Sequence, residues 1–160
     1  IHVINVDAHL DTRDDQQASS GTPFRQFKKA HPSFKLTQVG IHAFANCEAN
    51  YQKMDDMKVI SFDELSNNPS FEKLISIDPS ELTVFSLDCD ALDCGIMSAV
   101  SAPNHDGIDL KTLKSLIQFY LDTCPQRILG VYEYNPVFDD LSAKGARLIA
   151  NLILKFYERS

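Results

Sequence analysis

The sequence predicts an α/β protein with three layers, in which helices cover both faces of a mainly parallel sheet. Short runs of β-branched and aliphatic residues alternate along the chain with amphipathic helical patterns, and such alternation is typical of a parallel sheet flanked by helices. Several of the runs are continuously apolar, as expected when both faces of a strand are buried. The 160 residues contain no repeat and no linker rich in Pro, Gly or Ser. We therefore expect one domain, residues 1–160.

Five apolar runs are predicted to be strands, in chain order IHVINV, KLTQVGI, MKVI, LTVFSL and RILGVY. Their ranges are Ile1–Val6, Lys35–Ile41, Met57–Ile60, Leu82–Leu87 and Arg127–Tyr132. Each run holds four to seven residues, a usual strand length. A strand opens the chain without a preceding Met or leader, so we expect that N-terminal strands of the parent sheet are missing.

Helices are predicted between or after these strands. Weak apolar patterns indicate helices over Phe44–Asp56 and Phe71–Ile77. The clearest pattern follows Asp109, a residue type favoured at helix N-caps, and it keeps the apolar residues up to Leu121 on one stripe. A last amphipathic helix is expected over Leu141–Tyr157.

Composition excludes several classes of function. The net charge of −7 argues against a nucleic-acid or anionic-membrane binder, since phosphate neutralisation needs clustered Lys and Arg. No apolar run reaches 18 residues, so no membrane span is predicted. The four cysteines form no CxxC pair and are interpreted as free thiols of a reducing compartment. A cytoplasmic location follows from that interpretation.

Polar clusters follow three of the predicted strands: DAHLD, SLDCDALD and YEYNP. In open α/β sheets, ligands bind at the carboxyl ends of the strands. Side chains in an extended segment alternate faces, so Asp7, His9 and Asp11 can project together. Asp88 and Asp90 can do the same after the fourth strand. Either pattern alone is common on solvated loops, but their shared position at strand ends favours a metal site.

The donor types suggest which metal. Carboxylate oxygens with a single imidazole suit Mn²⁺, Mg²⁺ or Ca²⁺ better than metals that prefer thiolates. Several aspartates in one pocket repel one another unless a cation lies between them. Sites of this kind hold two ions that can share a hydroxide.

DAHLD, SLDCDALD and EYNP, in this order and at these intervals, resemble the ureohydrolase superfamily of arginase and agmatinase. SSGTPFRQ at Ser19–Gln26, VSAP at Val100–Pro103 and EYNPVFD at Glu133–Asp139 resemble its formimidoylglutamase branch. The resemblance runs from Ile1 to Tyr157 and identifies the chain as a C-terminal portion of an arginase-like α/β domain.

The resemblance implies a dimanganese enzyme that cleaves a C–N bond of a linear amidine. Asp7, His9, Asp88 and Asp90 would bind one Mn²⁺, and Asp7, Asp11 and Asp88 the other. A bridging hydroxide would attack the formimino carbon of N-formimidoyl-L-glutamate, releasing formamide and L-glutamate in histidine degradation. The same match makes Glu133 and Asp11 the predicted catalytic residues.

The substrate implied by the resemblance carries two carboxylates, so cationic side chains are expected nearby. Arg13 and Arg25 are the candidates, because a guanidinium fork suits a carboxylate, although each could equally be a plain surface residue. Ser20 matches a substrate-contacting serine of arginases. Glu133 matches the carboxylate that holds the cationic amidine.

Three departures from the family pattern bear on these expectations. Phe24 stands where arginases carry a histidine, which favours the formimidoylglutamase branch. Cys94 replaces the proline that usually follows Asp93. Family members also have about 100 or more further N-terminal residues, beyond what this one-domain chain holds, and these supply a histidine ligand. We therefore expect one firmly held Mn²⁺ in this chain and poor turnover, which two equivalents of Mn²⁺ at full activity would contradict.

Alternative functions stay open at this point. The amidine could be agmatine or arginine, or the chain could be a non-catalytic module that keeps the ligands of the fold. A carboxylate-rich Mg²⁺ phosphohydrolase is disfavoured, because the sequence offers no Gly-rich phosphate loop. Family members commonly form trimers or hexamers, so the resemblance allows a homo-oligomer.

Overall fold

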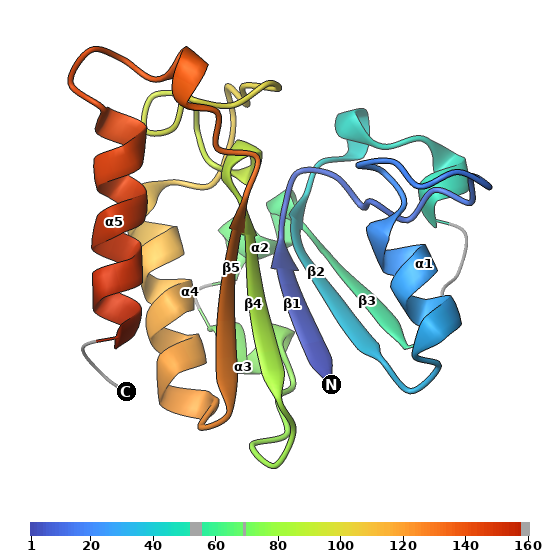
Figure 1. Cartoon of the computed structure of the whole chain (residues 1–160). Coiled ribbons are helices and arrows are strands. Elements are labelled where there is room, and N and C mark those ends of the chain that lie inside the picture. The colour runs from blue at the N-terminus through green and yellow to red at the C-terminus, as the bar shows by residue number, and fades with distance from the viewer. Residues whose placement is uncertain (52–55, 69, 158–160) are drawn as a thin grey trace.

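The chain folds into a five-stranded parallel sheet with helices on both faces, as a computed structural model of residues 1–51, 56–68 and 70–157 shows (Figure 1). The strand order is β3-β2-β1-β4-β5. The strands are β1 (His2–Val6), β2 (Lys35–Ile41), β3 (Met57–Ser61), β4 (Thr83–Asp88) and β5 (Arg127–Tyr132). The α-helices are α1 (Pro23–Ala30), α2 (Phe62–Asn67), α3 (Phe71–Leu74), α4 (Leu110–Thr123) and α5 (Lys144–Tyr157). This architecture confirms the predicted α/β class.

The register of the sheet aligns the carboxyl ends of its central strands. Val6, the last residue of β1, lies opposite Val39 of β2 and Leu87 of β4. Asp88, the last residue of β4, lies opposite Tyr132 of β5. All the strands are parallel, so the segments that follow β1, β4 and β5 emerge along one edge of the sheet.

Alternation along the strands divides the core between the two faces of the sheet. Ile4 and Phe85 belong to a large buried cluster that also contains residues of α2, α3, α4 and α5. Val3 and Leu36 belong to a smaller cluster with Phe34, against which α1 packs through Phe24 and Phe27. Neighbouring residues of one strand point to opposite faces, so these two clusters form the two interfaces of a three-layer fold.

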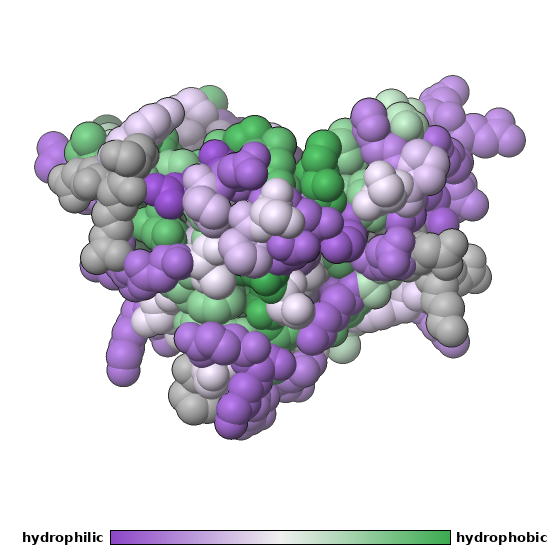
Figure 2. All heavy atoms as spheres, turned by 90° about the horizontal axis from the view of Figure 1, so that it is seen from below, coloured by the Kyte–Doolittle hydropathy of each residue, from purple (hydrophilic) through white to green (hydrophobic). Residues whose placement is uncertain are grey.

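The face that α1 covers is partly open beside β5. Ile128 and Tyr132 are about half exposed there, at 49% and 54%, although both lie in a strand at the edge of the sheet. Figure 2 looks at the molecule from the amino ends of the strands and shows hydrophobic residues on both sides of a notch between two lobes. An apolar part of the sheet face is thus accessible from solvent.

The structure confirms the five predicted strands, with ends that differ by one residue at most. It also confirms Asp109 as the N-cap of α4, since its Oδ1 accepts a hydrogen bond from the backbone N–H of Thr112 at 2.7 Å. The last helix begins at Lys144, three residues later than predicted, because Asp140 and Ser142 form a hydrogen-bonded turn before it. None of the described helices is long and apolar enough to cross a membrane.

Two helix predictions need correction. The segment predicted as the helix Phe44–Asp56 forms two short 3₁₀ turns, at Ala43–Ala45 and Glu48–Tyr51, and residues 52–55 lie outside the described residues. The side chain of Asn46 donates hydrogen bonds to the backbone carbonyls of Ala8 and His42. Asn forms such bonds in turns, where they compete with a continuous helix. The helix predicted over Phe71–Ile77 ends at Leu74, after which the backbone is extended.

Two helices were missed by the sequence reasoning. The helix α1 is only eight residues long and has a proline at its start, which is a usual helix-start signal. The helix α2 is preceded by Ser61, whose Oγ accepts from the backbone N–H of Glu64 at 3.1 Å. Ser-x-x-Glu is a capping-box pattern, so SFDE at 61–64 contained a detectable signal.

Candidate metal and active site

Three acidic residues meet where adjacent strands end. Asp7 directly follows β1, Asp88 ends β4, and Glu133 directly follows β5. β1 pairs with β4, and β4 pairs with β5. The parallel register therefore places these carboxylates along one edge of the sheet, where α/β proteins bind ligands.

A histidine and two aspartates form the tightest group at this edge. One donor atom from each of Asp7, His9 and Asp90 lies within 4.8 Å of the other two. Nδ1 of His9 is 3.3 Å from Oδ2 of Asp90 and 3.5 Å from Oδ1 of Asp7. Both aspartates are buried, at 2% and 5% exposure, whereas His9 is half-buried. Asp90, which comes 83 positions after Asp7 in the sequence, thus joins the DxHxD segment.

Amide side chains hold this segment in place. Nδ2 of Asn5 donates to Oδ2 of Asp7 at 3.1 Å and to Oε1 of Gln38 at 2.9 Å. Nδ2 of Asn46 donates to the carbonyl of Ala8 at 2.9 Å, and its Oδ1 accepts from the N–H of Leu10 at 2.8 Å. The sequence reasoning missed these supporting residues. Asn5 follows the same alternation as Asp7 and could have been found, whereas nothing in the spacing of Gln38 or Asn46 relates them to DAHLD. Such groups orient metal ligands and tune their affinity.

Burial raises the pKa values of the aspartates around this group. The pKa of Asp7 is raised, mainly by desolvation and further by the charge of Asp90. Desolvation and the neighbouring Asp7 raise the pKa of Asp11 to about 7. Desolvation, Asp7 and Asp90 together raise the pKa of Asp88 to about 9. Crowded carboxylates at low dielectric favour protonation or the close approach of a cation.

The pKa of His9 is raised to about 10, first by its hydrogen bond with Asp7 and then by that with Asp90. The imidazole therefore carries a proton between the two carboxylates at neutral pH. That proton occupies the position from which Nδ1 could bind a metal ion. Protons and a divalent cation thus compete for the same donor atoms.

The donor set fits a hard divalent cation. Oδ1 of Asp90 is buried and has no hydrogen-bond partner among the described residues. A buried carboxylate oxygen without a partner is costly, and coordination to a cation would satisfy it. Two carboxylates and one imidazole are ligands that Mn²⁺ and Mg²⁺ accept. Asp7, His9 and Asp90 are therefore the residues that could hold the ion.

A cavity of about 500 Å³ lies beside this group, on the partly open face of the sheet. Acidic residues belong to its lining, and most of the other lining side chains are apolar and come from β1, β4, β5, α1 and neighbouring segments. The predicted site residues that line it are Asp7, Asp11, Ser20, Asp88 and Glu133. Phe24, the departure from the arginase pattern, also lines it. One cavity thus unites predicted residues from four separate segments of the sequence.

Asp11 and Glu133 share an unusual backbone conformation. Their φ angles are +52° and +58°, in the left-handed region that few non-glycine residues adopt. Such residues cluster at functional sites, where the surrounding structure holds them. The hydroxyl of Ser101 donates to Oε2 of Glu133 at 3.2 Å, so the VSAP segment contacts the EYNP segment.

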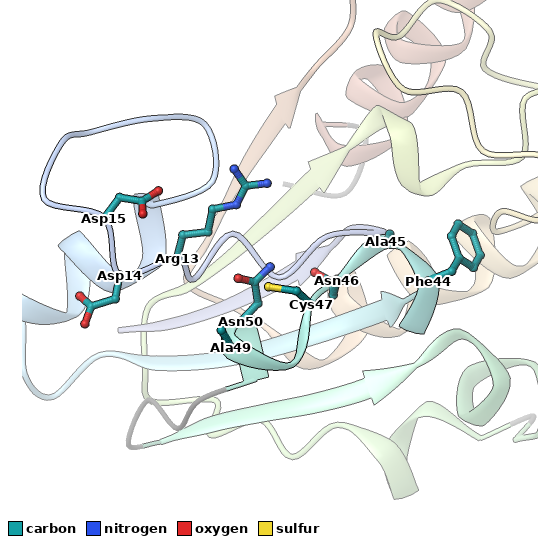
Figure 3. Close-up of a pocket in the computed structure, with 9 residues that line it drawn as sticks. All are labelled: Arg13, Asp14, Asp15, Phe44, Ala45, Asn46, Cys47, Ala49 and Asn50. Atoms are coloured by element: carbon teal, nitrogen blue, oxygen red, sulfur yellow. The ribbon is translucent and has the colours of Figure 1, made fainter.

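Arg13 lies on a separate cavity of about 600 Å³, whose lining includes Asn46, Cys47 and Asn50 (Figure 3). Its side chain lies across Gly21, where an added Cβ would be 2.8 Å from Cδ and Nε of Arg13. The structure therefore does not bring Arg13 into the group of residues that line the carboxylate cavity. The glycine permits this close approach.

Arg25 is engaged with the loop after DAHLD. Its Nε donates to the carbonyl of Thr12 at 2.7 Å and lies 4.0 Å from Oδ1 of Asp14. The side chain is largely buried, at 16% exposure. These contacts tie α1 to the segment that carries Asp11. The predicted contact of Arg25 with a substrate carboxylate stays a prediction.

Comparison with known proteins identifies related sequences. The family model described as "Arginase family" matches residues 1–157. The formimidoylglutamase of Psychrobacter cryohalolentis is 29% identical over 170 residues, which cover 99% of this chain and 49% of the relative. That of Klebsiella pneumoniae is 33% identical over 165 residues, which cover 95% and 51%. The chain thus spans about half the length of these curated relatives.

Solved structures show the same fold. Formimidoylglutamase from Bacillus subtilis superposes with a TM-score of 0.86 at 22% identity, over 99% of this chain and 52% of that protein. A Trypanosoma cruzi formiminoglutamase solved with Mn²⁺ superposes with a TM-score of 0.83 at 24% identity, over 98% and 55%. At these identities the likeness concerns the fold, and it confirms that the fold is arginase-like.

Proposed function

Because the chain belongs to the arginase family, we propose that it forms the metal-binding part of a manganese-dependent hydrolase that cleaves a C–N bond of a linear amidine. The proposed substrate is N-formimidoyl-L-glutamate, and the products are L-glutamate and formamide. The relatives named formimidoylglutamase support this substrate over agmatine or arginine. A homo-oligomeric assembly and a cytoplasmic location stay predictions.

One observation carries the proposal. Asp7, His9 and Asp90 place three donor atoms within 4.8 Å of one another, and Asp7 also lines the cavity that contains Glu133. A cation held by the three ligands would therefore lie at the wall of a cavity with a further carboxylate. Bound there, Mn²⁺ would supply a coordinated water whose pKa is lowered from about 15.7 towards neutrality.

The chain's own residues would orient the substrate. An amidinium group carries a positive charge, and Glu133 offers a carboxylate in the same cavity. A charge-assisted hydrogen bond between them would fix the amidine carbon relative to the metal ligands. The hydroxyl of Ser101 holds one oxygen of Glu133, which limits the rotation of that carboxylate.

Asp11 and Asp88 would complete the acidic wall of the cavity. The pKa of Asp11, raised to about 7, means that this carboxyl can hold or release a proton near neutral pH, whereas the higher pKa of Asp88, about 9, favours its protonated form there. We propose that Asp88, like Asp7, serves both ions, and that Asp11 contributes an oxygen ligand only to the second, weaker ion. One firmly held Mn²⁺ is therefore expected in this chain.

The test is an assay of the Mn²⁺-loaded chain with three amidines: N-formimidoyl-L-glutamate, agmatine and arginine. Formamide and glutamate from the first substrate alone are expected, with slow turnover. Glu133→Gln should abolish that turnover, and Glu72→Gln, a change of an exposed glutamate on α3, should not. Urea from agmatine or arginine would overturn the choice of substrate. Tight binding of one Mn²⁺ without turnover of any amidine would favour a non-catalytic module.

A further inference from the structure

The loop that follows Asp90 closes on itself and brings a cysteine against a histidine. The backbone N–H of Asp93 donates to the carbonyl of Ile108 at 3.1 Å, and that of Cys94 donates to the carbonyl of Asn104 at 2.7 Å. These bonds belong to two isolated parallel bridges. The loop ends lie so close at residue 107 that an added Cβ would be 2.4 Å from backbone atoms. Only glycine fits there.

This closure fixes the pair Cys94 and His105. Sγ of Cys94 lies 3.1 Å from Nδ1 of His105, which is hydrogen-bonding distance for a thiol and an imidazole. Cys94 is half-buried and His105 is exposed. His105 also lines a cavity of about 400 Å³ together with His9 and Asp106. Solvent and small molecules can therefore reach the pair.

The other three cysteines differ from Cys94 in this respect. Cys89 and Cys124 are buried, and burial raises the pKa of the Cys89 thiol to about 12 and also raises that of Cys124. Cys47 is exposed, but among the described residues no histidine forms a hydrogen bond with its sulfur. Cys94 alone among the described cysteines combines access to solvent with a neighbouring base.

We propose that Cys94 is a modification site, a nucleophilic thiol that His105 activates towards peroxides. The imidazole would accept the thiol proton while the sulfur attacks one oxygen of hydrogen peroxide. An S–O bond forms and the O–O bond breaks, and the departing hydroxide takes the proton as water. Sulfur is oxidised to the sulfenic acid and peroxide is reduced, so that no other co-reactant is needed. A base beside a cysteine is the arrangement that activates this nucleophile.

The modification would occur on the loop that links two parts of the candidate site. Asp90 lies four positions before Cys94, and Ser101, which holds Glu133, lies seven positions after it. Oxidation would replace the thiol hydrogen of Cys94 with a hydroxyl group, so its 3.1 Å contact with His105 would change. This inference does not depend on the amidine reaction, and it can be tested without turnover.

The experiment exposes the EDTA-treated chain to hydrogen peroxide at pH 7 in the presence of dimedone, which traps sulfenic acids. Mass spectrometry of the peptides then gives the rate of labelling at each cysteine. We expect Cys94 to react at least about tenfold faster than Cys47, because general-base assistance accelerates reactions by about a hundredfold or more in well-formed sites. Cys89 and Cys124 should stay unlabelled. Equal labelling rates at Cys94 and Cys47 in the unmodified chain would overturn the proposal, and no variant is needed for this result.

A variant pair tests the role of the imidazole. His105→Asn removes the base from an exposed position and should lower the rate at Cys94 to that of Cys47. His31→Asn, a change of another exposed histidine whose ring lies tilted against that of Phe27, should leave the rate unchanged. An unchanged rate at Cys94 in His105→Asn would assign its reactivity to exposure instead of His105. The rate at Cys47 serves as the internal control in every sample.

Discussion

Asp90→Asn tests the metal site most directly. Asp90 is buried, contacts Nδ1 of His9 at 3.3 Å, and keeps one oxygen without a partner. Asparagine has nearly the same size but lacks the negative charge and one of the two oxygens. We therefore expect the variant to fold and to lose most of its affinity for Mn²⁺.

The magnitude follows from the linkage between binding and folding. At a Mn²⁺ concentration of 100 times Kd, a ligand that binds only the folded chain raises the free energy of unfolding by about 2.7 kcal/mol. At about 2–4 °C per kcal/mol for a chain of this size, the melting temperature should rise by about 5–11 °C. If the loss of one of three ligands weakens binding by about 100-fold, the same concentration gives about 0.4 kcal/mol. The shift then falls to about 1–2 °C.

The assay is thermal unfolding followed by circular dichroism, with and without Mn²⁺, and with EDTA to reverse the effect. Asp93→Asn is the matched control. Asp93 is half-buried on the same loop, and its Oδ1 accepts from the N–H of Gly95 at 2.8 Å. It lies outside the group formed by Asp7, His9 and Asp90, so this variant should keep the full shift.

Two results would refute the reasoning. If Asp90→Asn kept the full Mn²⁺-dependent shift, Asp90 would not be a ligand. If Asp90→Asn and Asp93→Asn lost the shift equally, Mn²⁺ would be attracted by the net negative charge of the loop and would not be bound at a specific site. Equilibrium dialysis of Mn²⁺ with each variant separates weak binding from altered folding.

Three further predictions concern the scaffold. Tyr120→Phe should lower the free energy of unfolding by about 1–2 kcal/mol in chemical denaturation, because the buried hydroxyl donates to the carbonyl of Thr83 at 2.6 Å. Gly107→Ala should lower it by about 1–3 kcal/mol or more, because the new Cβ would overlap backbone atoms across the loop. Burial lowers the pKa of His2 below 6.5, so its contribution to stability should be fully present above pH 6.5 and lost as the pH falls through the lowered value. His2→Gln, compared with the unmodified chain in melts from pH 8 to pH 5, should remove that part of the pH dependence.

Each of these predictions has its own control. Tyr157→Phe changes an exposed tyrosine and should leave the unfolding free energy nearly unchanged. Gly95→Ala places a Cβ 2.8 Å from a carboxylate oxygen of Asp93, which can move aside, so its cost should be smaller than that of Gly107→Ala. His31→Asn changes an exposed histidine and serves as the control substitution in the same melts. If the stability of His2→Gln fell as steeply between pH 8 and pH 5 as that of the unmodified chain, His2 would not be the cause of the pH dependence.

The local sequence determined the strands and the segments that carry the candidate site. Strand-length apolar runs followed by DAHLD, SLDCDALD and YEYNP were enough to place the acidic residues at strand ends, because hydrophobic periodicity and chain alternation are local properties. The cap at Asp109 was equally local. The helices α1 and α2, with eight and six residues, were too short to show a helical period, since the pattern needs several turns to repeat.

Only the tertiary structure decided which side chains meet. The family resemblance already grouped Asp7, His9, Asp88 and Asp90, but only the fold shows that Asp90 is the one that lies against Asp7 and His9. Asp88 instead accepts from the backbone N–H of Asp90 and lines the cavity. The family resemblance suggested that Arg13 contacts the substrate, but its side chain lies across Gly21 and lines a different cavity. The contact of Cys94 with His105 depends on the two bridges that close their loop. Each of these outcomes depends on strand register or backbone approach between residues distant in the sequence, and local patterns carry no information about such distances.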